Sequence, residues 1–391
     1  GLTGGPRGSG PGLPPGVERL PGPSLAGRPG GPERRGTSGS GRGRGAGAAL
    51  ARVVRALPWA APLLATSGLT VLCGARRSVP DEGEPEEDRP EAMSTEEAMR
   101  FPLVGSAVLI TLFACFKFFS KDLVNKVLAL YFVVLGVFSL TQLVHPFAAP
   151  LFPRRVRDFE LRLRSPKVPY LLDPPLDQPL DGPSLVLGAL SAGVCAVYYV
   201  TRHWLLNNAL GIAFSVTGIE VLPLGSTWNG LILLWGLFFY DIFWVFCTPV
   251  MVSVARNFDA PIKLLFPRAY WGEAAEGDFP FSMLGLGDIV LPGLYLALMM
   301  RLDAERAKAG RPGGYFRATM AGYLLGLVVT LVVMTAFNAA QPALLYIVPG
   351  VTVASFGHAW RRGELSELYH WEEEEPEEEG EEGAAAKSKD D

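Results

Sequence analysis

The sequence has few of the residues that build metal sites and disulfides. It contains four cysteines and four histidines in 391 residues. The cysteines stand singly in or at the ends of apolar segments, without the paired spacing of a disulfide framework or a zinc site; they are Cys73, Cys115, Cys195 and Cys247. The histidines are scattered, and the H-E-x-x-H pattern is missing. The positions of the cysteines therefore imply no disulfide framework, and the histidines argue against an intramembrane zinc protease.

Charged residues are scarce as well. They make up 19% of the chain, against 49% for hydrophobic residues, and the mean hydropathy is positive. Such a chain is too apolar for an ordinary soluble domain, and about 20 consecutive apolar residues suffice to cross a bilayer as a helix. The sequence therefore predicts an all-α polytopic membrane protein. We expect nine spans, at residues 56–73, 101–119, 123–148, 183–201, 204–225, 229–252, 280–301, 316–337 and 342–360.

The two ends of the chain differ in composition from this apolar middle. Residues 1–50 are rich in Gly, Pro and Arg, and residues 363–391 form an acidic tail. Both are typical of disordered segments, and we find no nucleic-acid motif in the basic one. The predicted organisation is thus a disordered 1–50, a first group of spans over 51–225, a second group over 226–362, and a disordered cytosolic tail.

The positions of Lys and Arg indicate the orientation in the membrane. Loops 74–100, 149–182 and 302–315 are richer in these residues than the loops between them, and so is the segment after residue 360. Because cytoplasmic loops collect positive charge, we expect the N-terminus outside and the C-terminus in the cytosol. The chain ends in KSKDD, and Lys387 and Lys389 then form a K-x-K-x-x signal for retrieval to the endoplasmic reticulum.

Two carboxylates interrupt the apolar segments of the second group of spans. Asp241 lies within LLWGLFFYDIFWVFCTPVMV, and Asp288 lies within FSMLGLGDIVLPGLYLALMM. A charge at the bilayer centre costs roughly 2.5 to 3.5 kcal/mol on insertion scales, so a compensating role is expected. If both segments are helical, consecutive antiparallel spans place the two acids roughly 16 and 12 Å from their shared loop. They are therefore predicted to face each other.

A facing pair of carboxyl groups has a definite chemistry. Two such groups cannot both ionise easily and tend to share one proton, so that one activates water while the other hydrogen-bonds a peptide carbonyl. Gly285 and Gly287 permit another backbone to approach Asp288 closely, and the Tyr240 hydroxyl is expected to line the same cavity. Intramembrane aspartates also serve proton-coupled transporters and channels, and a catalytically silent scaffold that retains substrate helices is a third alternative.

The last predicted span begins with a third polar element, QPALLY. Pro342 is compatible with an ordinary helix start. Alternatively, an unwound segment over Gln341, Pro342, Ala343 and Leu344 would present backbone groups to an extended substrate, which a peptidase needs because a helical peptide bond is shielded. Composition and spacing leave both interpretations open.

With YDIFWVF, GLGD and QPALLY in this order, the chain closely resembles signal peptide peptidase, the aspartyl intramembrane protease related to presenilins. The segments RHWLLNNALGIAFSVTGIE and VMVSVARNFDAPIKLLFP are also similar to that family, and the resemblance covers roughly residues 100 to 369. FCTPVMV is similar to the plant-type branch.

The resemblance implies a nine-span hydrolase of the endoplasmic reticulum membrane that cuts remnant signal peptides and other type II-oriented helices within lipid. It implies that Asp241 and Asp288 are catalytic, and that Pro342, Ala343 and Leu344 support the active site. No metal or cofactor is expected. Transmembrane peptides and membrane lipid are the expected partners, nucleic acid is not, and self-association is left open.

Overall fold

The computed structural model describes residues 60–80, 90–164, 177–257, 260–267, 281–337 and 341–373. The predictions made for residues 1–50, for the tail beyond residue 373 and for Lys387 and Lys389 fall outside this part of the chain.

Long helices dominate the described residues, as the predicted all-α class requires. The first covers residues 60–77. It is followed by α2 (Thr95–Phe118), α3 (Lys121–Ala148), α5 (Gly182–Thr201), α6 (Trp204–Val221), α7 (Thr227–Phe246), α9 (Gly287–Lys308), α10 (Tyr315–Phe337) and α11 (Leu344–Arg362). The short helices are η2 (Ala149–Leu151), α4 (Arg154–Arg157), α8 (Val250–Asn257) and α12 (Leu365–Tyr369). Two antiparallel hairpins, β1 (Glu160–Arg164) with β2 (Asp177–Asp181) and β3 (Lys263–Pro267) with β4 (Phe281–Gly285), were not predicted.

Five of the described helices are long and apolar enough to cross a membrane: α2, α3, α5, α7 and α10. The total of nine spans stays a prediction, because the other long helices that the structure describes are not both long and apolar enough to be identified in the same way. Several helices begin at residues whose side chains accept a hydrogen bond from the first turn. Ser94 and Glu97 form a capping box before α2, and Ser226 caps α7 through the Asn229 N–H.

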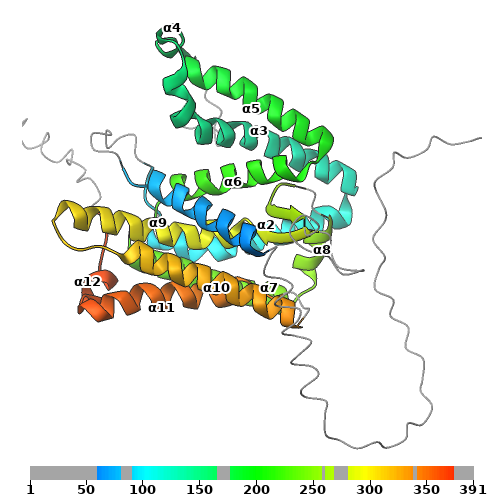
Figure 1. Ribbon diagram of the computed structural model, residues 1–391. Helices are drawn as coiled ribbons and strands as arrows, with labels where there is room; N and C mark the ends of the chain where they lie inside the picture. The colour runs from blue at the N-terminus through cyan, green and yellow to red at the C-terminus, as the bar shows by residue number, and fades with distance from the viewer. Residues whose placement is uncertain are drawn as a thin grey trace, which may run out of the picture. The chain divides into compact units, whose positions relative to one another are not determined.

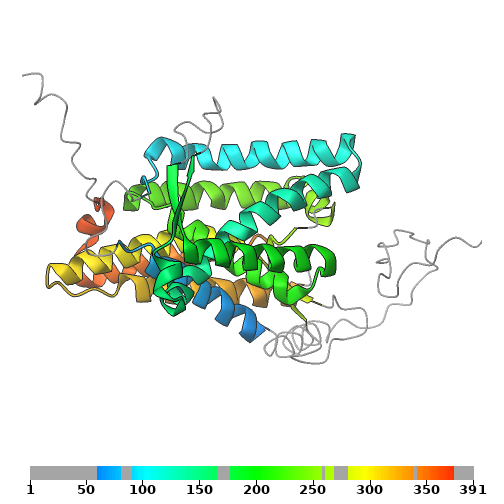
Figure 2. The same cartoon turned by 90° about the horizontal axis from the view of Figure 1, so that it is seen from above.

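The helices form two neighbouring groups that share α6. On one side α3 and α5 pack against each other and against α6, around Leu140, Cys195 and Leu210 (Figure 1). On the other side, α7, α9, α10 and α11 enclose the main core, and α2 lies along the outer side of α7 (Figure 2). Because α6 also contacts α9 and β3, it connects the first group to the segment that carries Asp288.

Two helices approach each other especially closely. A methyl group at Gly322 on α10 would collide with the backbone oxygen of Gly350 on α11, and one at Gly350 would lie 2.6 Å from the Gly322 oxygen. At Gly326 the added carbon would lie 2.7 Å from the Cα of Ile347. Small residues allow backbones to pack this tightly in membrane proteins. The α10–α11 contact therefore depends on glycine on both sides.

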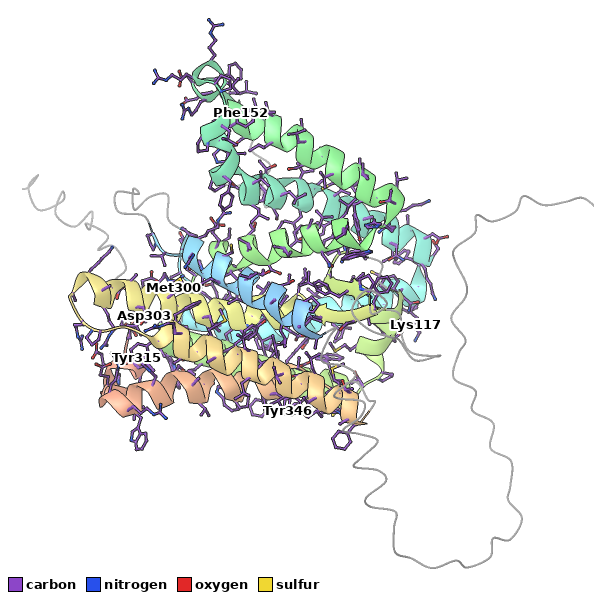
Figure 3. All side chains as sticks on the ribbon, viewed as in Figure 1. Lys117, Phe152, Met300, Asp303, Tyr315 and Tyr346 are labelled. Carbon is purple, nitrogen blue, oxygen red and sulfur yellow. The ribbon has the colours of Figure 1, made fainter. Side chains whose placement is uncertain are left out.

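Charged side chains hold together the end of the core where α9 and α11 finish. Arg306, which is 4% exposed, donates to Glu364 at 2.6 Å and to Glu367 at 2.9 Å. Arg311 binds both oxygens of Glu367 at 2.6 Å. At the same end, Asp303 accepts hydrogen bonds from three backbone N–H groups at the start of α10, from Gly314, Tyr315 and Phe316. Figure 3 shows Asp303 and Tyr315 at this end and Tyr346 toward the other. We refer to it as the charged end.

The structure corrects two predicted spans. Residues 229–252 do not form one helix, because α7 ends at Phe246 and α8 starts at Val250. Pro249 explains the break, since proline lacks an N–H and disfavours helix at the preceding residue. Residues 280–301 are not one helix either, because β4 covers Phe281–Gly285 before α9 begins. The depths calculated for Asp241 and Asp288 from an unbroken helical rise are therefore both wrong.

Candidate active site

Asp241 lies near the end of α7 and is 7% exposed. Its helix packs against α2, α9 and α11. The backbone N–H of Leu344, the first residue of α11, donates to Oδ2 of Asp241 over 3.3 Å. The first N–H groups of a helix have no partner within the helix and favour a negative charge nearby. The start of α11 thus supplies a donor to a carboxylate that is otherwise buried among apolar residues.

Asp288 stands in the first turn of α9, immediately after the β3–β4 hairpin. Its side chain folds back over the end of β4, because a Cβ added to Gly285 would lie 3.3 Å from its Oδ2. The hydroxyl of Tyr323 on α10 donates to the backbone oxygen of Asp288 over 3.2 Å. The helices that carry the two acids, α7 and α9, are in contact.

The predicted Q-P-A-L element lies beside Asp241. Gln341 and Pro342 are not helical, Ala343 forms a turn, and α11 begins at Leu344. The last three of these residues are buried, whereas Gln341 is partly exposed. The backbone is thus irregular at residues 341–343 but already helical at Leu344, and the presentation of this segment to a substrate stays a prediction. Its contact with Asp241 is the hydrogen bond from Leu344.

The remaining predicted residues lie at different distances from the two acids. Gly287 is exposed at the start of α9, and an added Cβ would meet only Leu291, at 3.8 Å. Tyr240 packs over Gly105 of α2, where an added Cβ would lie 3.6 Å from its ring, and its ring is tilted against that of Trp244. The described contacts of Tyr240 are therefore with α2 and with its own helix. Its predicted place in the cavity stays a prediction.

Two features of this end were missed at the sequence level. The first is the hairpin, whose strand FSMLG is a short apolar run and cannot be told from helix by periodicity. The second is Tyr323, which lies on a different helix and meets Asp288 only in the fold. No signal in the sequence separates Tyr323 from other tyrosines in apolar segments.

The arrangement suits hydrolysis by two acids. The Asp241 carboxylate accepts a hydrogen bond from the backbone at the start of α11. Asp288 lies in the first turn of α9, with its carboxylate against Gly285. Among the residues that the structure describes, no group of three or more His, Cys, Asp or Glu side chains could hold a metal ion.

Comparison with known proteins gives consistent matches. The family model described as signal peptide peptidase matches residues 85–375. The mouse protein named signal peptide peptidase is 40% identical over 317 residues, which cover 80% of this chain and 83% of the mouse protein. The human signal peptide peptidase is 39% identical over the same shares of the two chains. Intramembrane protease 2 of Caenorhabditis elegans is 47% identical over 186 residues, 45% of this chain and 40% of that protein. The likeness of FCTPVMV to the plant-type branch stays a prediction.

Proposed function

Because the chain belongs to the signal peptide peptidase family, as an aspartic intramembrane endopeptidase of multi-pass topology, we propose that Asp241 and Asp288 are its catalytic pair. Its substrates in this proposal are remnant signal peptides and other type II-oriented transmembrane helices. The observation that carries the assignment is the Leu344 N–H on Asp241 at the head of α11, with Asp288 at the head of the adjoining α9.

The proposed reaction needs one proton shared by the pair. The ionised carboxylate takes a proton from water, the water oxygen attacks the peptide carbonyl, and the protonated partner hydrogen-bonds the carbonyl oxygen. Collapse of the tetrahedral intermediate breaks the C–N bond, and the amine leaves with a proton from the pair. Leu344 favours Asp241 as the carboxylate that stays ionised, because its N–H donates to the charged oxygen.

An extended substrate fits this site better than a helical one. The backbone groups of Lys263 and Leu265 in β3 bond to asparagines of α6, which leaves Leu264–Leu284 and Phe266–Ser282 as the hydrogen-bonded pairs of the hairpin. In β4 the backbone groups of Met283 and Gly285 therefore point away from β3. The side chain of Met283 is 41% exposed. A peptide strand added along this outer edge would pass directly beside Asp288. Hydrolysis needs such a local unwinding, since a helix shields its peptide bonds.

The proposed location is the endoplasmic reticulum membrane, with the N-terminus in the lumen and the C-terminus in the cytosol. The loop charges and the KSKDD terminus support it. Changing Lys387 and Lys389 to Ala together should let the protein leave the reticulum for later compartments. Unchanged reticulum staining of this variant would count against retrieval by these lysines.

Purified protein incubated with a labelled signal peptide tests the proposed chemistry. The wild type should cleave the peptide, whereas Asp241→Asn, Asp288→Asn and the double variant should all be equally inactive, because neither acid works alone. A transporter would instead show no cleavage at all and separable effects of the two changes on ion flux. A silent scaffold would bind the peptide without cutting it. Substantial proteolysis by either single variant would falsify the assignment.

A further inference from the structure

Two neighbouring asparagines of α6 bind the backbone of β3. The side chain of Asn208 accepts a hydrogen bond from the Leu265 N–H at 2.8 Å and donates to the Leu265 oxygen at 2.8 Å. Asn207 donates to the Lys263 oxygen at 2.7 Å. Both side chains are buried, 4% exposed for Asn207 and 6% for Asn208. The amide of Asn208 thus bonds to β3 as a neighbouring strand would.

This contact occupies one edge of the hairpin only. Lys263 and Leu265 turn their backbone groups toward α6. Because the direction alternates along a strand, the backbone groups of Leu264 and Phe266 face β4. The hydrogen bond from the Leu286 N–H to the Ile262 oxygen, 2.9 Å, continues the same alternation. The asparagines therefore hold the inner edge of the two-stranded sheet, and the outer edge of β4 is the one beside Asp288.

The same face of α6 also packs against Leu286, the residue between the two glycines of G-L-G-D. Gly211 lies one helical turn beyond Asn207 and Asn208. A Cβ at Gly211 would lie 3.0 Å from Cδ2 of Leu264 and 3.2 Å from Cδ2 of Leu286. On the other side, the Tyr198 hydroxyl of α5 donates to Asn207 over 3.3 Å. One face of α6 thus makes polar contacts with the backbone of β3 and apolar contacts with Leu264 and Leu286, and Leu286 lies two residues before Asp288.

We propose that Asn207 and Asn208 are positioning residues of the protease, which fix the hairpin and thereby set which substrate bond lies at Asp288. The inference rests on the proposed function, because it assumes that Asp288 is catalytic and that substrate pairs with β4. A β-strand can change its pairing register only by whole residues. If β3 loses its hydrogen bonds to α6, the hairpin can shift, and a peptide paired with the outer edge of β4 then changes register relative to Asp288. Neither asparagine touches the substrate in this proposal; both act through the backbone of β3.

The substitutions separate the two hydrogen bonds of Asn208. Asn208→Asp keeps the size and the acceptor for Leu265 but loses the donor and sets a carboxylate against a carbonyl oxygen. Asn208→Ala loses both bonds. Gly211→Ala leaves the asparagines intact, and its added methyl group crowds the side chains of Leu264 and Leu286 instead. Should Asn208→Ala fail to fold, the other two variants still carry the test.

Asn229 supplies the matched control. It is also a buried asparagine, 7% exposed, and hydrogen-bonds Met93, which precedes α2, and Thr95, the first residue of α2. Its described hydrogen bonds are with Met93, Thr95 and Ser226 and not with β3 or β4, so Asn229→Ala should lower thermal stability without moving the cleaved bond. Mass spectrometry of the products from a labelled signal peptide gives the cleaved positions, and initial rates at saturating peptide give kcat.

We expect Asn208→Ala to lower kcat about tenfold, the loss that corresponds to about 1.4 kcal/mol, and to spread cleavage over neighbouring bonds. Asn208→Asp and Gly211→Ala should spread it in the same way. Unchanged products and kcat in Asn208→Ala, or an equal spread in Asn229→Ala, would overturn the proposal.

Hydrogen exchange on the same variants separates this inference from the proposed function. Asn208→Ala should speed exchange at residues 262–267 and 281–286 relative to the wild type and to Asn229→Ala. If these amides do not respond, the asparagines do not hold the hairpin, whatever the activity. If they respond but the wild type shows no cleavage that depends on Asp288, the proposed function fails instead.

Discussion

The two ends of the α9–α11 core are held in different ways. At the charged end Arg306 and Arg311 bind carboxylates of Glu364 and Glu367 that follow α11. At the end that carries Asp241 and Asp288, the Asp241 carboxylate accepts one hydrogen bond from the Leu344 N–H. The Tyr323 hydroxyl donates to the backbone oxygen of Asp288, whose carboxylate lies against Gly285. Charge is thus compensated within the protein at one end. At the end that carries Asp241 and Asp288, no described ion pair compensates the charge of either acid.

The two ends also differ in the regularity of their backbone. The charged end joins regular helices through side chains that reach across short loops, and its contacts can hold whether or not substrate is present. The other end contains a hairpin, a non-helical proline and two helix starts whose N–H groups need partners. Changes at the site should therefore alter cleavage, whereas changes at the charged end should alter stability.

The largest expected effect is that of Pro342→Leu. Leucine supplies an N–H and permits helix at Gln341, so α11 would extend backward and the Leu344 N–H would bind a carbonyl within the helix instead of Asp241. Cleavage of a labelled signal peptide should be abolished in a folded, inserted protein. Pro349→Leu makes the same exchange inside α11 and should keep most of the activity. Full activity of a well-expressed Pro342→Leu protein contradicts the role given to this segment.

Next in size is the effect of Arg306→Ala on stability. The change removes a buried guanidinium that donates to Glu364 and Glu367, although Glu364 keeps the Tyr315 hydroxyl, and a hydrogen bond to a charged group contributes about 1.5–3 kcal/mol. Thermal unfolding in detergent should shift to clearly lower temperature, while the cleaved bonds stay the same in the protein that remains folded. Arg361→Ala, at an exposed position of α11, should change the free energy of unfolding by less than about 0.5 kcal/mol. A shifted cleavage site in Arg306→Ala would remove the distinction between the two ends.

A smaller effect is expected from Tyr323→Phe. It removes the hydroxyl that donates to the backbone oxygen of Asp288, and one such bond contributes about 0.5–1.5 kcal/mol. We therefore expect kcat to fall by about two- to tenfold. Tyr295→Phe is the control, because that hydroxyl bonds to Ser355 and not to the backbone at Asp288. Equal losses of kcat in both variants would show that any buried tyrosine hydroxyl matters equally.

The smallest effect concerns pH and the charged end. Burial acts to raise the pKa of Glu364, but the hydrogen bonds from Tyr315 and Arg306 outweigh it and leave the pKa lowered. A carboxyl group with a lowered pKa in the folded state adds stability above its unfolded pKa of about 4.3, and this is lost as pH falls through the folded value. The thermal midpoint should therefore fall on acidification below about pH 4. Glu364→Gln should show a shallower fall, and an equally steep one would assign the effect to other groups.

The sequence predicted the two acids and the Q-P-A-L segment because each is a polar or helix-breaking exception in an apolar span. Helix bounds such as α3 and α10 were predicted closely for the same reason, since long apolar runs have clear ends. Pro249 marks the break after Phe246 in the sequence, because proline disfavours helix at the preceding residue. The β3–β4 hairpin and the contact of Asn208 with Leu265 could not be predicted, because short apolar runs are ambiguous and the two partners lie far apart in the chain.

The contact between Gly322 and Gly350 limits how this protein can change by mutation. A side chain gained on one helix is often accommodated when its partner on the facing helix becomes smaller. Here both partners already have the smallest side chain, and each meets the backbone of the other. No second substitution at the facing position can restore the fit. A lineage that loses either glycine must separate α10 from α11, and any shift of α11 would also move the Leu344 N–H that binds Asp241.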